Sequence, residues 1–156
     1  MNRSPEGFFD SSRGIWQGDP LSPLLFVFVI EALSRMLSVG INNGFLEGFK
    51  VGNVTVSHLL FADDTLIFCK DSPNQLAYLQ DIFLLFEAAS RLKVNLAKSV
   101  LIPMGNVQQV DYLASILRCE VASLPLDYLG LPLGAPNNAS HIWDGILEKM
   151  VHRLAS

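Results

Sequence analysis

The sequence has few cysteines and histidines, and those it has are spread along the chain. Cys69 and Cys119 lie far apart and form no Cys-x-x-Cys pair, and His58, His141 and His152 have no metal-binding spacing. This distribution argues against a disulfide framework and against a zinc site built on cysteine. We therefore expect an intracellular protein, in the nucleus or the cytoplasm, that is not secreted.

A long uninterrupted apolar run is also lacking. The longest one, Leu24 to Ile30, ends at Glu31, whereas a membrane-spanning helix needs about 20 predominantly apolar residues. Residues 2–12 contain no apolar core of the kind that signal peptides have. We expect no signal peptide, no membrane segment and no membrane partner.

Charged residues make up only 17% of the 156 residues, half of the residues are hydrophobic, and the mean hydropathy is +0.34. This composition is apolar for a soluble domain of this size, and it favours a piece of something larger whose buried faces are counted here. The net charge is −4 and the isoelectric point is about 5.2. Taken alone, that balance argues against a nucleic-acid-binding surface, which usually carries a basic excess.

Two Ser-Pro pairs, at residues 22–23 and 72–73, are typical of helix starts, because serine caps free N–H groups and proline suits the first helical position. The first predicts a helix that runs to about Ser38 and stops before Gly40. The second precedes apolar residues at helical spacing. Further patterns predict a hairpin over residues 49–56, a strand over 99–105, a helix over 107–118 capped by Asn106, a strand or tight hairpin over 127–134, and a last helix from about residue 140. Elements in this order, without strict alternation, favour an α+β fold with helices on one face of a sheet.

The stretch HLLFADDTLIFCKD, residues 58–71, places Asp63 and Asp64 inside an apolar run. Its near-symmetric flanks predict two strands that meet at a tight turn with the aspartates at its tip. Aspartate is common in turns because its side chain bonds local backbone groups, and this is one interpretation. The other is a site for a hard cation such as Mg²⁺, because two carboxylates held together in a low-dielectric setting repel each other unless a cation is present.

Polynucleotide phosphoryl transfer commonly uses two such ions about 3.5–4 Å apart. A haloacid-type phosphatase fits these residues less well, since its Asp-x-Asp-x-Thr spacing is not matched by ADDTL.

Four motifs in order resemble those of reverse transcriptases. They are GIWQGDPLSPLLF (Gly14–Phe26), FADD (Phe61–Asp64), LKVNLAKS (Leu92–Ser99) and YLGLPLG (Tyr128–Gly134). Their sequences are similar to the polymerases of non-LTR (LINE-type) retrotransposons, especially those of plants, and the resemblance covers nearly the whole chain. It implies an RNA-directed DNA polymerase fold of the right-hand type.

In this fold, residues 1–134 would be an incomplete palm, an antiparallel sheet with helices on one face, and residues 135–156 the helical start of the thumb. The resemblance implies that Asp63 and Asp64 are the catalytic carboxylates and ligands of Mg²⁺ or Mn²⁺. Gln17 and Gly18 would lie against the incoming nucleotide and the template base. A plain Gly-Asp-Pro turn into a helix is the alternative for the stretch QGDP, and it explains the last three residues but not Gln17. Lys98 would lie near the triphosphate, with a solvated lysine as the alternative.

The resemblance further assigns Tyr128, Leu129 and Gly130 to a hairpin that grips the primer end, and an ordinary core hairpin is the alternative. The implied partners are an RNA template, a DNA primer and a deoxynucleoside triphosphate.

Three departures from the family pattern stand out. The first metal-binding aspartate of the family precedes the Gln-Gly motif, and Asp10 does not lie in a matching motif. Trp16 occupies a position that is commonly arginine, and the basic fingers are lacking. We therefore expect an inactive fragment that binds nucleic acid weakly and self-associates through an exposed strand edge. The alternative is a domesticated palm that acts as a non-catalytic interaction or structural protein.

Overall fold

The structure is a computed structural model that describes residues 18–135 and 144–154. These residues form the helices α1 (Leu21–Asn42), α2 (Pro73–Ser90), α3 (Val110–Leu117) and α4 (Asp144–Leu154). Their strands are β1 (Phe49–Val51), β2 (Val54–Val56), β3 (His58–Phe61), β4 (Asp64–Ile67), β5 (Val100–Leu101), β6 (Glu120–Val121), β7 (Leu126–Tyr128) and β8 (Leu131–Leu133). The α+β class is thus confirmed.

The expected sheet is divided into separate pairs of strands. In the described part of the chain, β1–β2, β3–β4 and β7–β8 are antiparallel pairs and β5–β6 is a parallel pair. The prediction of one antiparallel sheet with helices on one face is therefore wrong for these residues. The physical reason is strand length, because strands of two to four residues are at the lower end of what a continuous sheet uses.

Helix α1 begins and ends outside its predicted bounds. The Asp19 side chain accepts a hydrogen bond of 2.8 Å from the Leu21 N–H, so the helix starts one residue before Ser22 and the predicted serine cap is wrong. At the other end, the helix continues through Gly40 to Asn42. A Cβ at Gly40 would lie 2.9 Å from the Tyr78 ring, so this glycine serves close packing and does not end the helix.

The start of α2 is confirmed at Pro73, with Ser72 as the N-cap residue. The Ser72 side chain makes no capping hydrogen bond, so the predicted serine cap is wrong here as well. The Ser72 carbonyl instead accepts the first hydrogen bonds of the helix, of 3.1 Å, from the N–H groups of Gln75 and Leu76. The helix ends at Ser90, and Arg91 follows it in the left-handed conformation.

The two hairpins predicted over residues 49–56 and 127–134, each with a glycine in its turn, are confirmed. Gly52 lies in the turn of β1–β2 with a φ of +58°, and Leu129 and Gly130 form a two-residue turn in β7–β8 with φ of +54° and +76°. Positive φ at both central residues is the geometry that matches the twist of a hairpin.

The other elements are shorter than expected. The strand predicted over 99–105 is reduced to β5, and the helix predicted over 107–118 begins at Val110 with Gln109, not Asn106, at its N-cap. The predicted start of the last helix near residue 140 lies outside the described residues, and its described part is α4.

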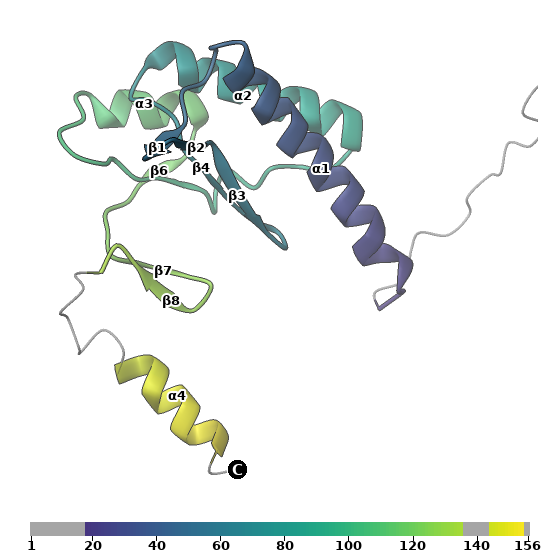
Figure 1. The fold of residues 1–156 in the computed structure, drawn as a ribbon, viewed down its shortest axis with the longest axis vertical. Coiled ribbons are helices and arrows are strands. Elements are labelled where there is room, and N and C mark those ends of the chain that lie inside the picture. The colour runs from purple at the N-terminus through teal and green to yellow at the C-terminus, as the bar shows by residue number, and fades with distance from the viewer. Residues whose placement is uncertain (1–17, 136–143, 155–156) are drawn as a thin grey trace, which may run out of the picture.

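The hydrophobic core lies where α1, α2 and α3 meet (Figure 1). Leu37, in the C-terminal half of α1, is its most buried residue, with 0% of its surface exposed. The buried side chains of this core are Leu33, Leu37, Leu46, Leu76, Leu79, Ile82, Phe86, Leu113 and Leu117. In Figure 1 the β7–β8 hairpin and α4 lie away from these three helices.

Gln75 is a buried polar residue that joins the β1–β4 region to α2. Its side-chain oxygen accepts hydrogen bonds from the Glu47 N–H (3.0 Å) and the Lys70 N–H (3.1 Å). Glu47 precedes β1 and Lys70 follows β4, so one side chain fixes the chain on both sides of the two hairpins. An exposed ion pair of 3.7 Å between Lys70 and Glu47 spans the same two segments.

The N-terminal half of α1 carries an exposed apolar surface, here called the α1 patch. Its members are Leu21, Leu24, Leu25, Val27 and Phe28, and Phe28 is 75% exposed. By length and composition α1 is apolar enough to cross a membrane, a criterion that a buried core helix of a soluble protein also meets. The expectation of no membrane segment considered only the shorter run Leu24 to Ile30, and it stays a prediction.

Replacing Gln75 by methionine tests its role in the fold. The change keeps the shape of the side chain but removes the acceptor of two backbone N–H groups, so we expect a loss of about 2 kcal/mol in the free energy of unfolding. Urea unfolding measures this loss. Gln80→Met, at a less buried position of the same helix, is the matched control, and equal losses for the two variants would contradict the role of Gln75.

We expect the chain to self-associate in solution through the α1 patch, because exposed contiguous apolar surface favours association. Light scattering should give a mass above that of a monomer, and Phe28→Glu should lower it. Ala32→Glu adds the same charge at an exposed position of α1 without removing a large apolar side chain. A monodisperse, cooperatively melting monomer in the unmodified chain would refute this expectation.

Candidate functional site

The adjacent aspartates lie at the tip of the β3–β4 hairpin, as the sequence predicts. Phe61 pairs with Asp64 at the end of the ladder, and Ala62 and Asp63 form the two-residue turn between them. Ala62 has a φ of +49°, a conformation that costs a non-glycine residue about 1–2 kcal/mol. The two carboxylates therefore stand on neighbouring residues of one tight turn.

The surroundings of the aspartates differ from the expectation. Asp63 and Asp64 are both exposed, and on the outward face of the hairpin Leu59 and Phe61 are 51% and 58% exposed. The low-dielectric setting that was expected around the carboxylates is therefore absent in the described part of the chain. The physical reason is that the apolar flanks of the hairpin point half of their side chains away from the core, because side chains alternate across a strand.

The atoms at the hairpin tip are of the type that binds hard divalent cations. Asp63 and Asp64 offer carboxylate oxygens, which Mg²⁺ prefers, although Mg²⁺ usually keeps several waters when a protein supplies only one or two carboxylates. Within residues 18–135 and 144–154, no cluster of three or more His, Cys, Asp or Glu side chains could hold a metal ion. The described residues thus bring two candidate carboxylate ligands together at the tip.

The Gln-Gly motif lies at the start of α1. Gly18 is exposed with a φ of +94°, and no heavy atom lies within 4 Å of where its Cβ would be. This leaves its backbone open to a close approach by a ligand. Gln17, like Asp10 and Trp16, lies outside the described residues.

Lys98 lies in the segment between α2 and β5. Its backbone N–H donates to the side-chain oxygen of Asn95 (3.2 Å), and its own side chain is exposed. This arrangement fits a solvated lysine, and it equally leaves the ammonium group open to an anionic ligand.

The predicted primer grip forms the β7–β8 hairpin. Tyr128 pairs with Leu131 and is half-buried, whereas Leu129 and Gly130 in the turn are exposed. This hairpin lies apart from α1–α3 in Figure 1, so it is not an ordinary part of their core.

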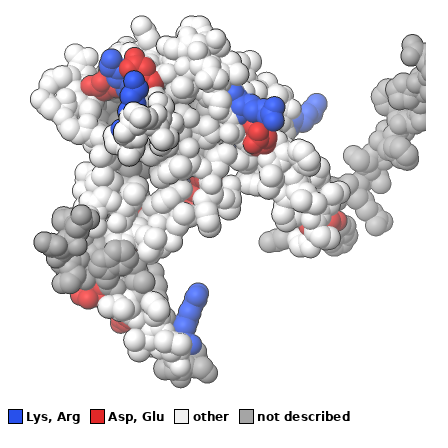
Figure 2. All heavy atoms as spheres, in the orientation of Figure 1, with Lys and Arg blue, Asp and Glu red and all other residues white. Residues whose placement is uncertain are grey.

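Charge is sparse on the face of the molecule drawn in Figure 2, where basic and acidic side chains lie beside each other. On α1, for example, Arg35 Nε donates to Glu31 Oε1 at 3.0 Å. On this face the described residues form no continuous basic track.

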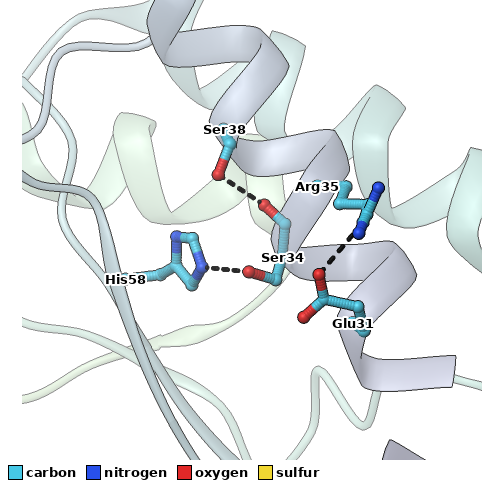
Figure 3. Close-up of polar contacts among 5 residues, drawn as sticks. All are labelled: Glu31, Ser34, Arg35, Ser38 and His58. Carbon is cyan, nitrogen blue, oxygen red and sulfur yellow. Dashed lines mark hydrogen bonds and ion pairs between the residues drawn. The ribbon is translucent and has the colours of Figure 1, made fainter. Parts of the chain in front are cut away.

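One contact near the site was missed by the sequence analysis. His58, the first residue of β3, has Nε2 2.8 Å from Ser34 Oγ of α1 (Figure 3). Its Nδ1 lies 2.8 Å from Ser57 Oγ. Burial lowers the pKa of His58 below its ordinary value near 6.5, and the negative charge of Glu31 partly opposes this effect. Sequence reasoning had only a weak signal for this contact, a serine in a mostly apolar helix.

Most of the chain matches one known protein family. Residues 1–133 match the model of the reverse transcriptase (RNA-dependent DNA polymerase) family. The chain belongs to this family, whose polymerases generally depend on divalent metal ions.

Three curated proteins are similar to this chain, and two of them are Pol polyproteins of retrotransposable elements. An uncharacterized mitochondrial protein of Arabidopsis thaliana is 46% identical over 67 residues, which are 42% of this chain and 55% of that protein. The Pol polyprotein of the type-2 retrotransposable element R2DM of Drosophila melanogaster is 40% identical over 90 residues, which are 58% of this chain and 8% of the polyprotein.

A Pol polyprotein from a type-1 retrotransposable element of Nasonia vitripennis is 44% identical over 59 residues, which are 38% of this chain and 5% of the polyprotein. The chain thus spans about half of one of these relatives and less than a tenth of the other two. The predicted resemblance to non-LTR retrotransposon reverse transcriptases is confirmed.

The lowered pKa of His58 predicts that acid destabilises the β3–β4 hairpin. The unfolded chain binds a proton at this histidine more tightly than the folded chain does. The contribution of neutral His58 to stability is therefore complete above pH 6.5 and is lost as the pH falls from there through the lowered pKa of the folded state.

Unfolding measured between about pH 8 and pH 5, the range in which histidine titrates, should reveal this loss. It should be absent in His58→Gln and present in His152→Gln, a change on α4. A pH dependence that is the same in the unmodified chain and in His58→Gln would refute the prediction.

Proposed function

We propose that this chain is part of the palm of a right-hand reverse transcriptase, with residues 1–134 as an incomplete palm and 135–156 as the start of the thumb. The observation that carries the proposal is the hairpin of β3 and β4, which presents Asp63 and Asp64 together at an exposed tip. The match of residues 1–133 to the family supports it.

The proposed reaction is template-directed DNA synthesis. The 3′-hydroxyl oxygen of a DNA primer attacks the α-phosphorus of a deoxynucleoside triphosphate and loses its proton, a new phosphorus–oxygen bond forms, and the bond to the β-phosphate breaks to release pyrophosphate. Asp63 and Asp64 would hold Mg²⁺ or Mn²⁺ through their carboxylate oxygens. Bound ions of this kind neutralise phosphate charge and make the attacking hydroxyl more acidic.

The other residues of the motifs would position the substrates. Gly18, with open space where a side chain would be, would let the nucleotide and template base approach the backbone, and Gln17 would lie beside it. The exposed ammonium group of Lys98 would lie near the triphosphate. The turn of β7–β8, at Leu129 and Gly130, would contact the primer end together with Tyr128.

The partners in this proposal are an RNA template, a DNA primer and a nucleotide, in the nucleus or the cytoplasm. This chain alone would hold the nucleic acid weakly, because acidic residues outnumber basic ones, 15 to 11, and affinity for nucleic acid depends on basic contacts to phosphates.

The same observations imply that further carboxylates are needed for catalysis. Two metal ions repel each other, and holding both requires several negative ligands, whereas the described residues bring two together at the hairpin tip. We propose that a further aspartate completes the site, and that this aspartate is not Asp10, which does not lie in a matching motif.

The second candidate function is a non-catalytic interaction protein derived from a palm. The exposed α1 patch favours it, since exposed apolar surface of this kind marks interaction sites. The two candidates differ in a measurable way, because an interaction protein would keep its partner when both aspartates are replaced.

We predict that the purified 156-residue chain does not extend a primer on an RNA template with Mg²⁺ or Mn²⁺ supplied. Incorrect positioning alone can remove several orders of magnitude in rate. A primer-extension assay with labelled primer measures this directly. Template-dependent extension by the unmodified chain that Asp63→Asn abolishes would falsify the proposal that the chain is incomplete.

A chimeric polymerase tests the role of the aspartates. In the Drosophila polyprotein, the matching segment is replaced by the corresponding residues of this chain. Asp63→Asn keeps the shape of the side chain but removes its charge, so we expect kcat to fall by on the order of 10²–10³ or more. Asp71→Asn, an exposed aspartate after β4, is the matched control, and equal effects of the two changes would sink the assignment.

A further inference from the structure

The hairpin that carries the aspartates is a small two-stranded unit with one polar link to α1. His58 stands at the open end of the hairpin, opposite Ile67, and the aspartates stand at the closed end. A two-stranded hairpin on its own is marginally stable in water. Its orientation therefore depends on what holds its open end.

The Phe68 N–H donates to the Ser57 carbonyl at 2.8 Å and closes that end, Gln75 holds the segment after β4, and two further contacts join the open end to the helices. Ile67 packs against the hydrophobic core, and the His58 ring bonds Ser34 of α1 through Nε2 at 2.8 Å. The second ring nitrogen is fixed by Ser57, the residue just before β3, also at 2.8 Å. With both nitrogens hydrogen-bonded, the ring is held by helix α1 and by the residue that precedes β3. Figure 3 shows the bond to the helix.

A small rotation of the hairpin at His58 displaces the tip that carries the aspartates by a larger distance. From His58 to the turn at Ala62 is four residues, or about 13 Å of strand. A rotation of about 10° at the open end would move the tip by about 2 Å. Catalytic groups commonly need to be placed within about 0.5 Å, so a modest change at His58 is large for Asp63 and Asp64.

Helix α1, which contacts His58 through Ser34, also begins just after Gly18 of the Gln-Gly motif. Gly18 lies just before α1, whose first residue is Leu21. Ser34 lies about 20 Å along the helix axis from Leu21 at the usual rise per residue. In Figure 1 the tip of the β3–β4 hairpin and the N-terminal end of α1 extend toward the same side of the molecule. One contact therefore relates the aspartates to the proposed nucleotide-binding glycine.

We propose that His58, held by Ser34 and Ser57, is a positioning residue that sets the orientation of the Asp63–Asp64 hairpin relative to α1. The effect of this positioning on catalysis rests on the proposed function, whereas the positioning of the hairpin by His58 does not. His58 touches no substrate in this proposal and acts through the placement of the aspartates.

Hydrogen exchange in the 156-residue chain tests the positioning. Ser34→Ala should speed the exchange of the β3 and β4 amides by about tenfold, which corresponds to one hydrogen bond of ordinary net strength, and leave α2 amides unchanged. Ser38→Ala is the matched control, because Ser38 Oγ donates to the Ser34 carbonyl of the same helix at 2.9 Å and does not bond the hairpin there (Figure 3). Ser34→Thr keeps a hydroxyl and should restore slow exchange.

His58→Phe provides the reciprocal change, and adding Ser34→Ala to it should have little further effect because the two residues share one bond. If His58→Phe also loses protection in α2, the milder Ser34→Ala decides the matter. Equal exchange of the hairpin amides in Ser34→Ala and Ser38→Ala would overturn the proposal.

The chimeric polymerase separates this inference from the proposed function. There Ser34→Ala should lower kcat by about tenfold with the KM for primer and template unchanged, since positioning of the carboxylates and not binding is affected, and Ser34→Thr should restore kcat. Faster hairpin exchange together with a polymerase in which Asp63→Asn is harmless would support the positioning and refute the proposed function. An unchanged kcat in Ser34→Ala, where Asp63→Asn is inactive, would show that the positioning by His58 does not affect catalysis and would overturn that part of the proposal.

Discussion

The packing of α1 against α2 is the constraint on which the rest of the structure depends. It is built around Leu37, which is fully buried, and Gly40, which lets the Tyr78 ring come close to the helix backbone. Each buried leucine of this core contributes about 1.5–3 kcal/mol relative to an exposed one. The β1–β2 and β3–β4 hairpins add little core of their own. Gln75 on α2 bonds the segments before β1 and after β4, and Ser34 on α1 bonds His58 of β3. The candidate site is thus positioned by the two helices.

The sequence predicts well those features that neighbouring residues determine. The turn between β3 and β4, the Gly52 turn and the start of α2 at Pro73 follow from local chemistry, because turn residues and proline restrict the backbone wherever they occur. The end of α1 is different, since Gly40 has the local signature of a helix stop but serves a contact with a side chain distant in the sequence. Pairing between strands that are distant in the sequence is likewise not determined by neighbouring residues. The strands were expected to join into one sheet, and they form separate pairs.

The candidate site shows the same division. The family motifs identify Asp63, Asp64 and Gly18 as candidates, and the hairpin tip at which the aspartates stand is a local feature. The solvent exposure of the aspartates cannot be predicted from neighbouring residues, because it depends on what packs against the outward face of β3. The alternation of side chains along the strand does not say which segment, if any, packs there. The bond between Ser34 and His58 joins a helix to a strand across intervening elements, so no spacing rule could have paired these residues.

The exposed apolar face and the exposed aspartates are two parts of one arrangement. Leu59 and Phe61 lie on the outward face of β3, and Asp64 shares that face because it pairs with Phe61. In water, the attraction between a carboxylate and a cation is weak, and it strengthens several-fold as the effective dielectric constant falls. Any layer that covers Leu59 and Phe61 would therefore bury apolar surface and, in the same step, strengthen cation binding at the adjacent carboxylates. Covering this apolar face of β3 and strengthening metal binding at Asp64 are therefore physically coupled.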